Sequence, residues 1–304
     1  MQQRRFHLAV PASTSNLGSG FDTLGLALKL HLTVTAVFGV DETCIQYSGE
    51  GADRIPADER NLLYRSYAYG CEKSGKTPLP VKMDIHNPIP LQRGLGSSGA
   101  AIAAGLMLAG IATGCLEETR LVQWGYELEG HPENISASLM GGFTVSCLHN
   151  GRVLTTRTHP PEHLVAVALI PDVTIPTEQA RRVLPKHISL QEAIFNIQRV
   201  ALWVMAIQNN GFALMRAASE DRLHQPYRSR FIPGFDAILS ASYDAGAHAT
   251  FLSGSGSTIL ALCGQDRAGA VECAMADVAR SHNLNCTTRI LELEGQGARY
   301  SELE

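Results

Sequence analysis

Apolar residues alternate with other residues in two stretches of the first half of the chain. These stretches cover 28–36 and 81–85, and their period of two predicts β-strands. Apolar residues at helical spacing follow, and they predict helices over about 98–113 and 116–128. Gly130 and Pro132 come directly after the second helix and form a stop signal. A further strand is expected at 141–147, after a glycine turn.

The second half repeats this mixture of strands and helices. A strand is expected at 164–170, and a long helical region from about 189 to 218 is broken at 209–211. Strands at 249–252 and 259–262, a helix at roughly 267–281 and a strand at 288–293 complete the pattern. The predicted fold class is therefore α+β with two domains. A hairpin signal at Asn150-Gly151 and the pair Pro160-Pro161 place the boundary between domains 1–155 and 156–304.

Composition narrows the class of protein. The chain has 304 residues, is 45% hydrophobic and 18% charged, and carries a formal charge of -4. This charge argues against a broad nucleic-acid or anionic-membrane surface. The longest apolar run, 100–112, is too short to span a bilayer, and no apolar segment typical of a secretory signal follows the first residues. Seven cysteines without a C-x-x-C pair fit reduced thiols, so we expect a cytoplasmic protein.

The glycine-rich stretch Pro90–Ser98 is the strongest candidate for chemistry. Gly94 and Gly96 let the backbone approach an anion, and a helix that starts at Ser97 or Ser98 offers its unpaired N–H groups and positive dipole end. A phosphate site is one interpretation, and an ordinary turn with a serine cap is the other. No lysine follows Gly96, so the stretch is not a Walker A loop, and it does not match the dinucleotide fingerprint.

A second glycine element, 253–258, lies between two predicted strands. It predicts either a hairpin turn or a second backbone cradle that faces the first across a cleft.

Several polar residues stand in unusual places. Asn16 and Asp22 lie in the segment 10–22, which is rich in small residues and is expected to be irregular. The two residues either form turns or point toward a ligand. Glu129 ends a predicted helix, where a carboxylate opposes the dipole, so it is either simply solvated or placed there for Mg²⁺. Arg181 and Arg228 belong to arginine-containing stretches that suit carboxylate binding, although spacing does not select among the arginines there.

Taken in order, the segments 11–22, 90–98 and 253–258 resemble the motifs of the GHMP kinases, the superfamily of galactokinase, homoserine kinase, mevalonate kinase and phosphomevalonate kinase. Further stretches are similar to its homoserine kinase branch, at 129–134, 177–185, 226–228 and 232–235. The resemblance covers nearly the whole chain. It implies an N-terminal ATP-binding α+β domain with a left-handed crossover, a C-terminal ferredoxin-like domain, and an active site between them. Gly99, Ser255 and Ser257 depart from the usual alanine, alanine and proline without removing a proposed ligand.

The resemblance also implies a reaction and its ligands. ATP would phosphorylate the side-chain hydroxyl of L-homoserine, with Mg²⁺ held by Ser97 and Glu129, and the choice between Ser97 and Ser98 stays open. Asn61 would contact the adenine, and the phosphates would lie against Pro90, Leu91, Gln92, Arg93, Gly94, Leu95, Gly96, Ser97 and Ser98. The amino acid would be bound by Asn16, Asp22, Arg181, Arg228, Gly254 and Ser255. A homodimer is expected at the level of the family.

Asn134 bears on the mechanism, because related kinases carry an aspartate at its position. An amide cannot accept the hydroxyl proton, so we expect Asn134 to position groups, with the proton passing late to a phosphate oxygen. Two rival functions stand beside this one: a kinase of shikimate, mevalonate or a sugar, and a non-catalytic binding or regulatory protein on the same fold.

Overall fold

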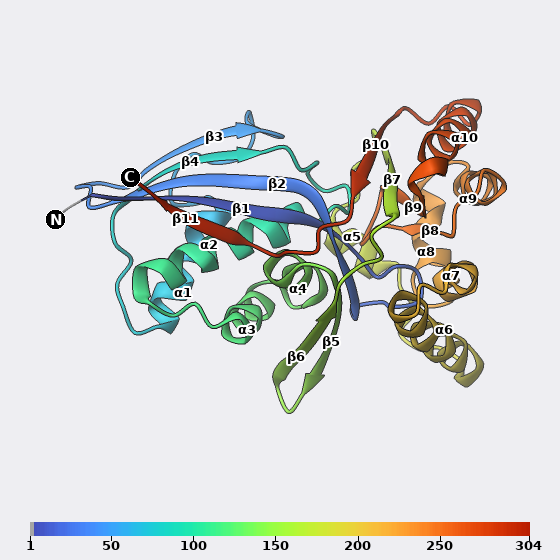
Figure 1. Cartoon of the computed structure of the whole chain (residues 1–304), viewed down its shortest axis with the longest axis horizontal. Helices are drawn as coiled ribbons and strands as arrows, with labels where there is room; N and C mark the ends of the chain where they lie inside the picture. The colour runs from blue at the N-terminus through green and yellow to red at the C-terminus, as the bar shows by residue number, and fades with distance from the viewer. Residues whose placement is uncertain (1–2) are drawn as a thin grey trace.

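The structure, a computed structural model, describes residues 3–304 and contains two sheets side by side (Figure 1). The larger sheet has seven strands, with the order β11-β1-β2-β4-β3 and a hairpin of β5 and β6 attached to β2. Its strands are β1 (Arg4–Ser15), β2 (Leu24–Phe38), β3 (Cys44–Gly49), β4 (Val81–Asn87), β5 (Phe143–His149), β6 (Arg152–Thr158) and β11 (Arg299–Leu303). Helices α1 (Leu62–Lys73), α2 (Ser97–Thr113), α3 (Glu118–Glu129) and α4 (Glu133–Met140) cover one face of this sheet.

The smaller sheet has the order β10-β7-β9-β8, and all its neighbouring strands are antiparallel. It comprises β7 (Leu164–Pro171), β8 (Ala249–Leu252), β9 (Ile259–Gly264) and β10 (Cys286–Glu292), with α9 (Phe235–Asp244) and α10 (Ala268–Ser281) packed together beside it. This is the split βαβ order of a ferredoxin-like domain, as predicted. Between β7 and α9 the chain forms α5 (Thr177–Arg182), α6 (Leu190–Gln208), α7 (Phe212–Ser219) and α8 (Gln225–Arg228).

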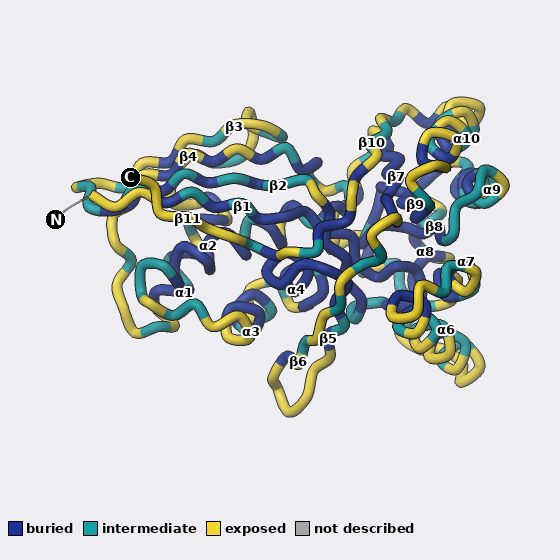
Figure 2. Tube along the Cα trace, viewed as in Figure 1, coloured by how far each residue is buried: buried dark blue, intermediate teal, exposed yellow. Residues whose placement is uncertain are grey.

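Strand β7 explains why its sequence is apolar at every position. Leu164, Ala166, Ala168 and Ile170 face the large core, whereas Val165, Val167 and Leu169 face a second core formed with α9 and α10. A strand buried on both faces has no polar side to alternate with. Figure 2 shows this buried region continuing through the middle of the molecule, where the two sheets meet.

The strands and helices predicted from periodicity are present, with ends shifted by a few residues, and the long helical region is interrupted between α6 and α7 as expected. The prediction of an irregular segment over 10–22 is wrong in its first half. Strand β1 extends to Ser15, with a bulge between Pro11 and Ala12, and only the residues after it form a turn. No element was expected from the sequence at strands β1, β3, β6 and β11 or at helices α1, α4, α5, α8 and α9.

The domain boundary at 155/156 stays a prediction. Strand β11, from the far end of the sequence, pairs with β1 in the larger sheet, and it lies beside β1 in Figure 1.

Within residues 3–304, no helix combines the length and apolar character needed to cross a bilayer.

The turn after β1 is anchored by the second half of the chain. The carbonyl oxygens of three successive residues, Leu17, Gly18 and Ser19, each accept a hydrogen bond from a buried side chain of that half. The donors are Trp203 Nε1 (2.8 Å), His224 Nε2 (2.8 Å) and Asn196 Nδ2 (3.0 Å), respectively. A buried carbonyl without a partner is costly, so these three bonds hold the turn against the second half.

We expect Trp203→Phe to lower the free energy of unfolding by about 2–4 kcal/mol, because it removes buried ring atoms and leaves the Leu17 carbonyl without its donor. Urea unfolding followed by circular dichroism measures the loss. Trp124→Phe is the matched control, since Trp124 is also buried but no hydrogen bond of its indole is found among the described residues. Equal losses in the two variants would contradict the role given to the hydrogen bond.

Candidate active site

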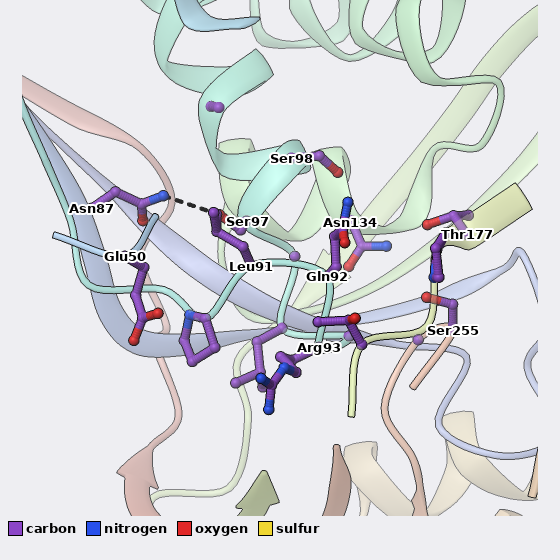
Figure 3. Close-up of a pocket in the computed structure, with 18 of the residues that line it drawn as sticks. Glu50, Asn87, Leu91, Gln92, Arg93, Ser97, Ser98, Asn134, Thr177 and Ser255 are labelled. Atoms are coloured by element: carbon purple, nitrogen blue, oxygen red, sulfur yellow. Dashed lines mark hydrogen bonds between the residues drawn. The ribbon is translucent and has the colours of Figure 1, made fainter. Parts of the chain in front are cut away.

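A cleft of about 1280 Å³ lies between the two halves of the molecule, and every site residue predicted from the sequence lines it. The N-terminus of α2 forms one wall, together with the glycine-rich loop. The turn after β1, the start of α5 and Arg228 of α8 form the other, and Gly254 and Ser255 of the second glycine element also line the cleft. Figure 3 shows Ser97, Ser98 and Asn134 near the end of α2, with Thr177 and Ser255 on the far side of Asn134 in this view.

The glycine-rich loop takes the left-handed backbone that its sequence suggests. Gly94 has φ 79°, and Gly96, the N-cap of α2, has φ 70°. No side chain caps the helix, so the alternative interpretation of an ordinary turn with a serine cap is wrong, and the first N–H groups of α2 are left to the cleft. The Ser97 hydroxyl instead accepts a hydrogen bond from Asn87 Nδ2 at 3.0 Å (Figure 3).

The second glycine element packs directly against the first, so the alternative of two cradles that face each other across a cleft is wrong. Ser253 Oγ donates to the carbonyl of Gly94 at 2.6 Å, and the Thr258 N–H donates to the carbonyl of Arg93 at 3.1 Å. A Cβ on Gly94 would lie 2.0 Å from the Ser253 carbonyl oxygen. The close packing therefore requires glycine at 94, and the second element supports the first from behind.

Glu129 ends α3 and reaches the start of α2. Its Oε1 accepts a hydrogen bond from Ser98 Oγ at 2.5 Å, whereas Oε2 is closed off from solvent and has no partner among the described residues. Burial raises the pKa of Glu129, although His131 and Ser98 partly oppose the shift. Carboxylate and hydroxyl oxygens are the ligands that Mg²⁺ takes, so this orphaned oxygen fits a hard cation. Among the described residues, this site included, no group of three or more acidic, histidine or cysteine side chains is arranged to hold a metal.

Asn134 is held in one orientation by its neighbours. Its Nδ2 donates to Ser15 Oγ at 3.0 Å and to Glu133 Oε1 at 3.1 Å, and its Oδ1 accepts from Ser13 Oγ at 3.1 Å. Glu133 is buried and pairs with His131, with Nδ1 and Oε1 3.2 Å apart. Desolvation works against the charged imidazole, but the hydrogen bond and charge of Glu133 prevail and raise the pKa of His131. The pairing with Glu133 thus favours the protonated imidazole of His131 beside the amide.

Asp22 and Arg181 form a two-pronged ion pair in the cleft. Arg181 Nη1 and Nη2 donate to the Asp22 oxygens at 3.0 and 2.8 Å. Both side chains are about one-third exposed, so solvent and ligands can reach them. The resemblance implied separate ligands for an ammonium and a carboxylate, and in the structure these two groups pair with each other.

Arg228 is only 2% exposed and is fixed from several sides. Its Nε donates to the carbonyl of Ala180 at 3.1 Å, and its Nη1 donates to the carbonyl of Gly254 at 3.2 Å. Desolvation, followed by repulsion from Arg181, lowers the pKa of Arg228 to about 10. The guanidinium therefore remains charged at neutral pH in a site that would gain from an anion.

Two predicted ligands are already engaged in hydrogen bonds. Asn16, with φ 68°, donates from Nδ2 to the Gly254 carbonyl at 2.9 Å and accepts the Asp22 N–H at 3.0 Å. Asn61 caps α1, accepting the Leu63 N–H at 3.0 Å and donating to the Pro56 carbonyl at 2.8 Å. Both side chains shape the walls of the cleft.

Sequence reasoning assigned no role to Asn87, Glu133, Phe21 or His224. Asn87 carries a recognisable signal, because it ends a strand directly before the glycine-rich loop. Glu133 and Phe21 lie within the stretches 129–134 and 11–22 that carry the resemblance, whereas His224, which is buried against Phe21, is placed there by contacts between distant parts of the chain.

Comparison with known proteins gives a consistent result. The family models for the N-terminal and C-terminal domains of GHMP kinases match residues 61–142 and 206–280. Homoserine kinases of Desulfitobacterium hafniense and Aquifex aeolicus are each 38% identical to this chain, with 95% and 96% of it aligned to 97% and 98% of their lengths. The crystal structure of homoserine kinase from Cytophaga hutchinsonii superposes with a TM-score of 0.87 at 28% identity, covering 98% of this chain and 97% of that one.

We expect Glu129→Gln to stabilise the ligand-free protein at neutral pH. The pKa of Glu129 is raised on folding, so the folded state must ionise a carboxyl that the unfolded chain ionises more easily. At about pH 4 both states are largely protonated and the variant gains little. As pH rises through the raised pKa, wild-type stability falls relative to the variant.

Melting temperatures of both proteins between about pH 4 and 8 measure the difference. Glu127→Gln serves as the control with the opposite sign, because the pKa of Glu127, which pairs with Lys73 and Tyr69, is lowered. A melting difference for Glu129→Gln that stays constant with pH would contradict the assignment.

Proposed function

The chain belongs to the homoserine kinase family of the GHMP kinases, and we propose that it transfers the terminal phosphoryl group of ATP to the side-chain hydroxyl of L-homoserine. The products are O-phospho-L-homoserine, ADP and a proton, and the reaction is a step of threonine biosynthesis. The observation that carries the proposal is the pairing, in one cleft, of a helix N-terminus free for phosphate with oppositely charged groups suited to a zwitterion.

The donor half of the site is built from backbone and hydroxyl groups. The loop 90–98 lies along the ATP phosphates, and Asn61 lies at the adenine end. Ser97 and Glu129 would hold Mg²⁺, and Ser98 orients the Glu129 carboxylate through its 2.5 Å hydrogen bond. When bound, Mg²⁺ neutralises charge on the phosphates, a task that a lysine performs in part in Walker A loops. The absence of a lysine after Gly96 then needs no replacement from another side chain.

In the acceptor half of the site, ion pairs between the substrate and the protein replace the ion pair of Asp22 with Arg181. The ammonium of homoserine pairs with Asp22, and its carboxylate pairs with Arg181 and Arg228, so the Asp22–Arg181 pair opens as the amino acid enters. Asp22 and Arg181 each keep an opposite partner throughout, and Arg228, which pairs with no acidic side chain among the described residues, gains one; this limits the desolvation cost of binding. Asn16, Gly254 and Ser255 line the same part of the cleft and complete the pocket.

The phosphoryl transfer proceeds without a side-chain base at 134. Asn134 is held by Ser13, Ser15 and Glu133, and this fixed amide orients the acceptor hydroxyl. A loose transition state needs alignment and charge stabilisation more than early deprotonation, so the proton leaves late, to a phosphate oxygen.

A cytoplasmic setting is also part of the proposal. All seven cysteines are free, and such a set favours the reducing cytoplasm. The homodimer expected for the family is also part of the proposal.

The function is tested by ADP release with ATP, Mg²⁺ and one acceptor at a time. We expect kcat/KM for L-homoserine to exceed that for L-serine, L-threonine, shikimate and mevalonate by about 100-fold or more, because only homoserine presents both charges and a hydroxyl at the right distance. A higher value for another acceptor would replace the substrate. No turnover with any of them would favour a non-catalytic binding protein.

We expect Asn134→Ala to lower kcat by about 10–100-fold, because the amide positions the acceptor hydroxyl. Asn134→Asp should retain more activity and shift the pH profile, since it restores polar contacts but adds a titratable group. Asn150→Gly, in the exposed turn between β5 and β6, is the control and should leave kcat unchanged. An unchanged kcat in Asn134→Ala would remove the positioning role.

A further inference from the structure

His224 is a fully buried histidine that has no part in the proposed reaction, yet it contacts both the turn after β1 and Arg228. Its Nε2 lies 2.8 Å from the carbonyl oxygen of Gly18, and its Nδ1 lies 3.3 Å from Arg228 Nη1. A carbonyl only accepts hydrogen bonds, and a guanidinium only donates them. The imidazole is therefore neutral, with its proton on Nε2 and a lone pair on Nδ1 directed at Arg228.

The charges around the ring agree with this neutral form. Asp221 Oδ2 lies 3.6 Å from Nε2, but that carboxylate already accepts the backbone N–H groups of His224 and Gln225. Arg228 faces the other side of the ring, and Asp22 contributes a weaker attraction. Burial dominates these influences and lowers the pKa of His224.

The Nδ1 lone pair determines which nitrogens of Arg228 are left for a ligand. Arg228 Nε is committed to Ala180, and Nη1 is shared between Gly254 and His224. Within residues 3–304, Nη2 makes no hydrogen bond, and Arg228 lines the cleft. Hydrogen bonds of Nε and Nη1 thus hold the Arg228 guanidinium in place. Nη2 is presented to the acceptor half of the site.

The His224 ring also stacks on Phe21, whose ring lies close to both Arg228 and Arg181. Phe21 stacks on His224 with ring centroids 5.1 Å apart and an angle of 25° between the planes. The guanidinium carbons of Arg228 and Arg181 lie 5.1 and 5.6 Å from the Phe21 centroid. The aromatic ring attracts both cations, which otherwise repel each other, and so keeps the two arginines close together.

We propose that His224 is a positioning residue that orients Arg228 for the substrate carboxylate, through its neutral Nδ1 acceptor and through Phe21. This inference rests on the proposed function, because it assigns the anion at Arg228 to the acceptor substrate. The positioned contact lies at the carboxylate, away from the hydroxyl that reacts, so it acts on substrate binding equally in the ground and transition states.

Two substitutions test the roles of the two ring nitrogens of His224 one at a time. His224→Gln places an amide where Nε2 lies, so it keeps a donor for Gly18 and loses the acceptor for Arg228. His224→Asn places an amide oxygen near Nδ1, so it keeps the acceptor and loses the donor for Gly18. If His224 had only a structural role, His224→Asn would be the less active variant, or both variants would lose activity equally.

We expect His224→Gln to raise KM for L-homoserine about tenfold or more, with kcat and KM for ATP within about twofold of wild type. His224→Asn should keep a KM for homoserine near that of wild type but melt at a lower temperature. The phosphorylation of 3-amino-1-propanol, which lacks the carboxylate, should have the same kcat/KM in wild type and His224→Gln.

An unchanged KM for homoserine in His224→Gln would overturn the inference, as would equal losses for homoserine, ATP and 3-amino-1-propanol. Failure of the proposed function looks different, because wild-type protein would then not phosphorylate homoserine at all.

Discussion

The structure depends on satisfying three consecutive buried carbonyls in the turn that follows β1. Leu17, Gly18 and Ser19 cannot reach a sheet or helix partner there, and their oxygens are closed off from water by the second half of the chain. Three side chains from that half supply the missing donors: Trp203, His224 and Asn196. The turn can be buried only against this partner surface. The position of Asp22, and with it the acceptor half of the cleft, follows from that one set of hydrogen bonds.

Several charged groups at the site also have partners within the protein. Asp22 and Arg181 pair with each other, and Ser98 donates to one oxygen of Glu129. The second oxygen of Glu129 is among the few buried polar atoms of the cleft residues that have no partner among the described residues. Such an atom reduces stability, and functional sites are where natural proteins retain that cost. The site is therefore least stable at the point where a cation would bind.

Local sequence signals predicted the parts of the fold that are decided locally. The apolar run of β7, the stop after α3 and the break between α6 and α7 each rest on a few neighbouring residues, and the structure contains all three. The glycine-rich loop was recognisable for the same reason. Its support by Ser253 was not, because nothing near residue 94 in the sequence indicates which distant segment will pack behind it. Strand β1 was missed where its bulge interrupts the alternation, and the ion pair of Asp22 with Arg181 joins residues 159 positions apart.

The pairing of β11 with β1 has a consequence for how the chain folds during synthesis. Arg4 and Glu302, whose side chains meet across these two strands at 2.8 Å, are 298 positions apart. On the ribosome, β1 and β2 are made early, and the outer edge of β1 then remains open until nearly all of the chain has emerged. An open strand edge is a template for pairing with other chains. The emerging protein thus depends on protection of this edge, by chaperones or by rapid completion of synthesis, and slow translation of its last third would favour aggregation over folding.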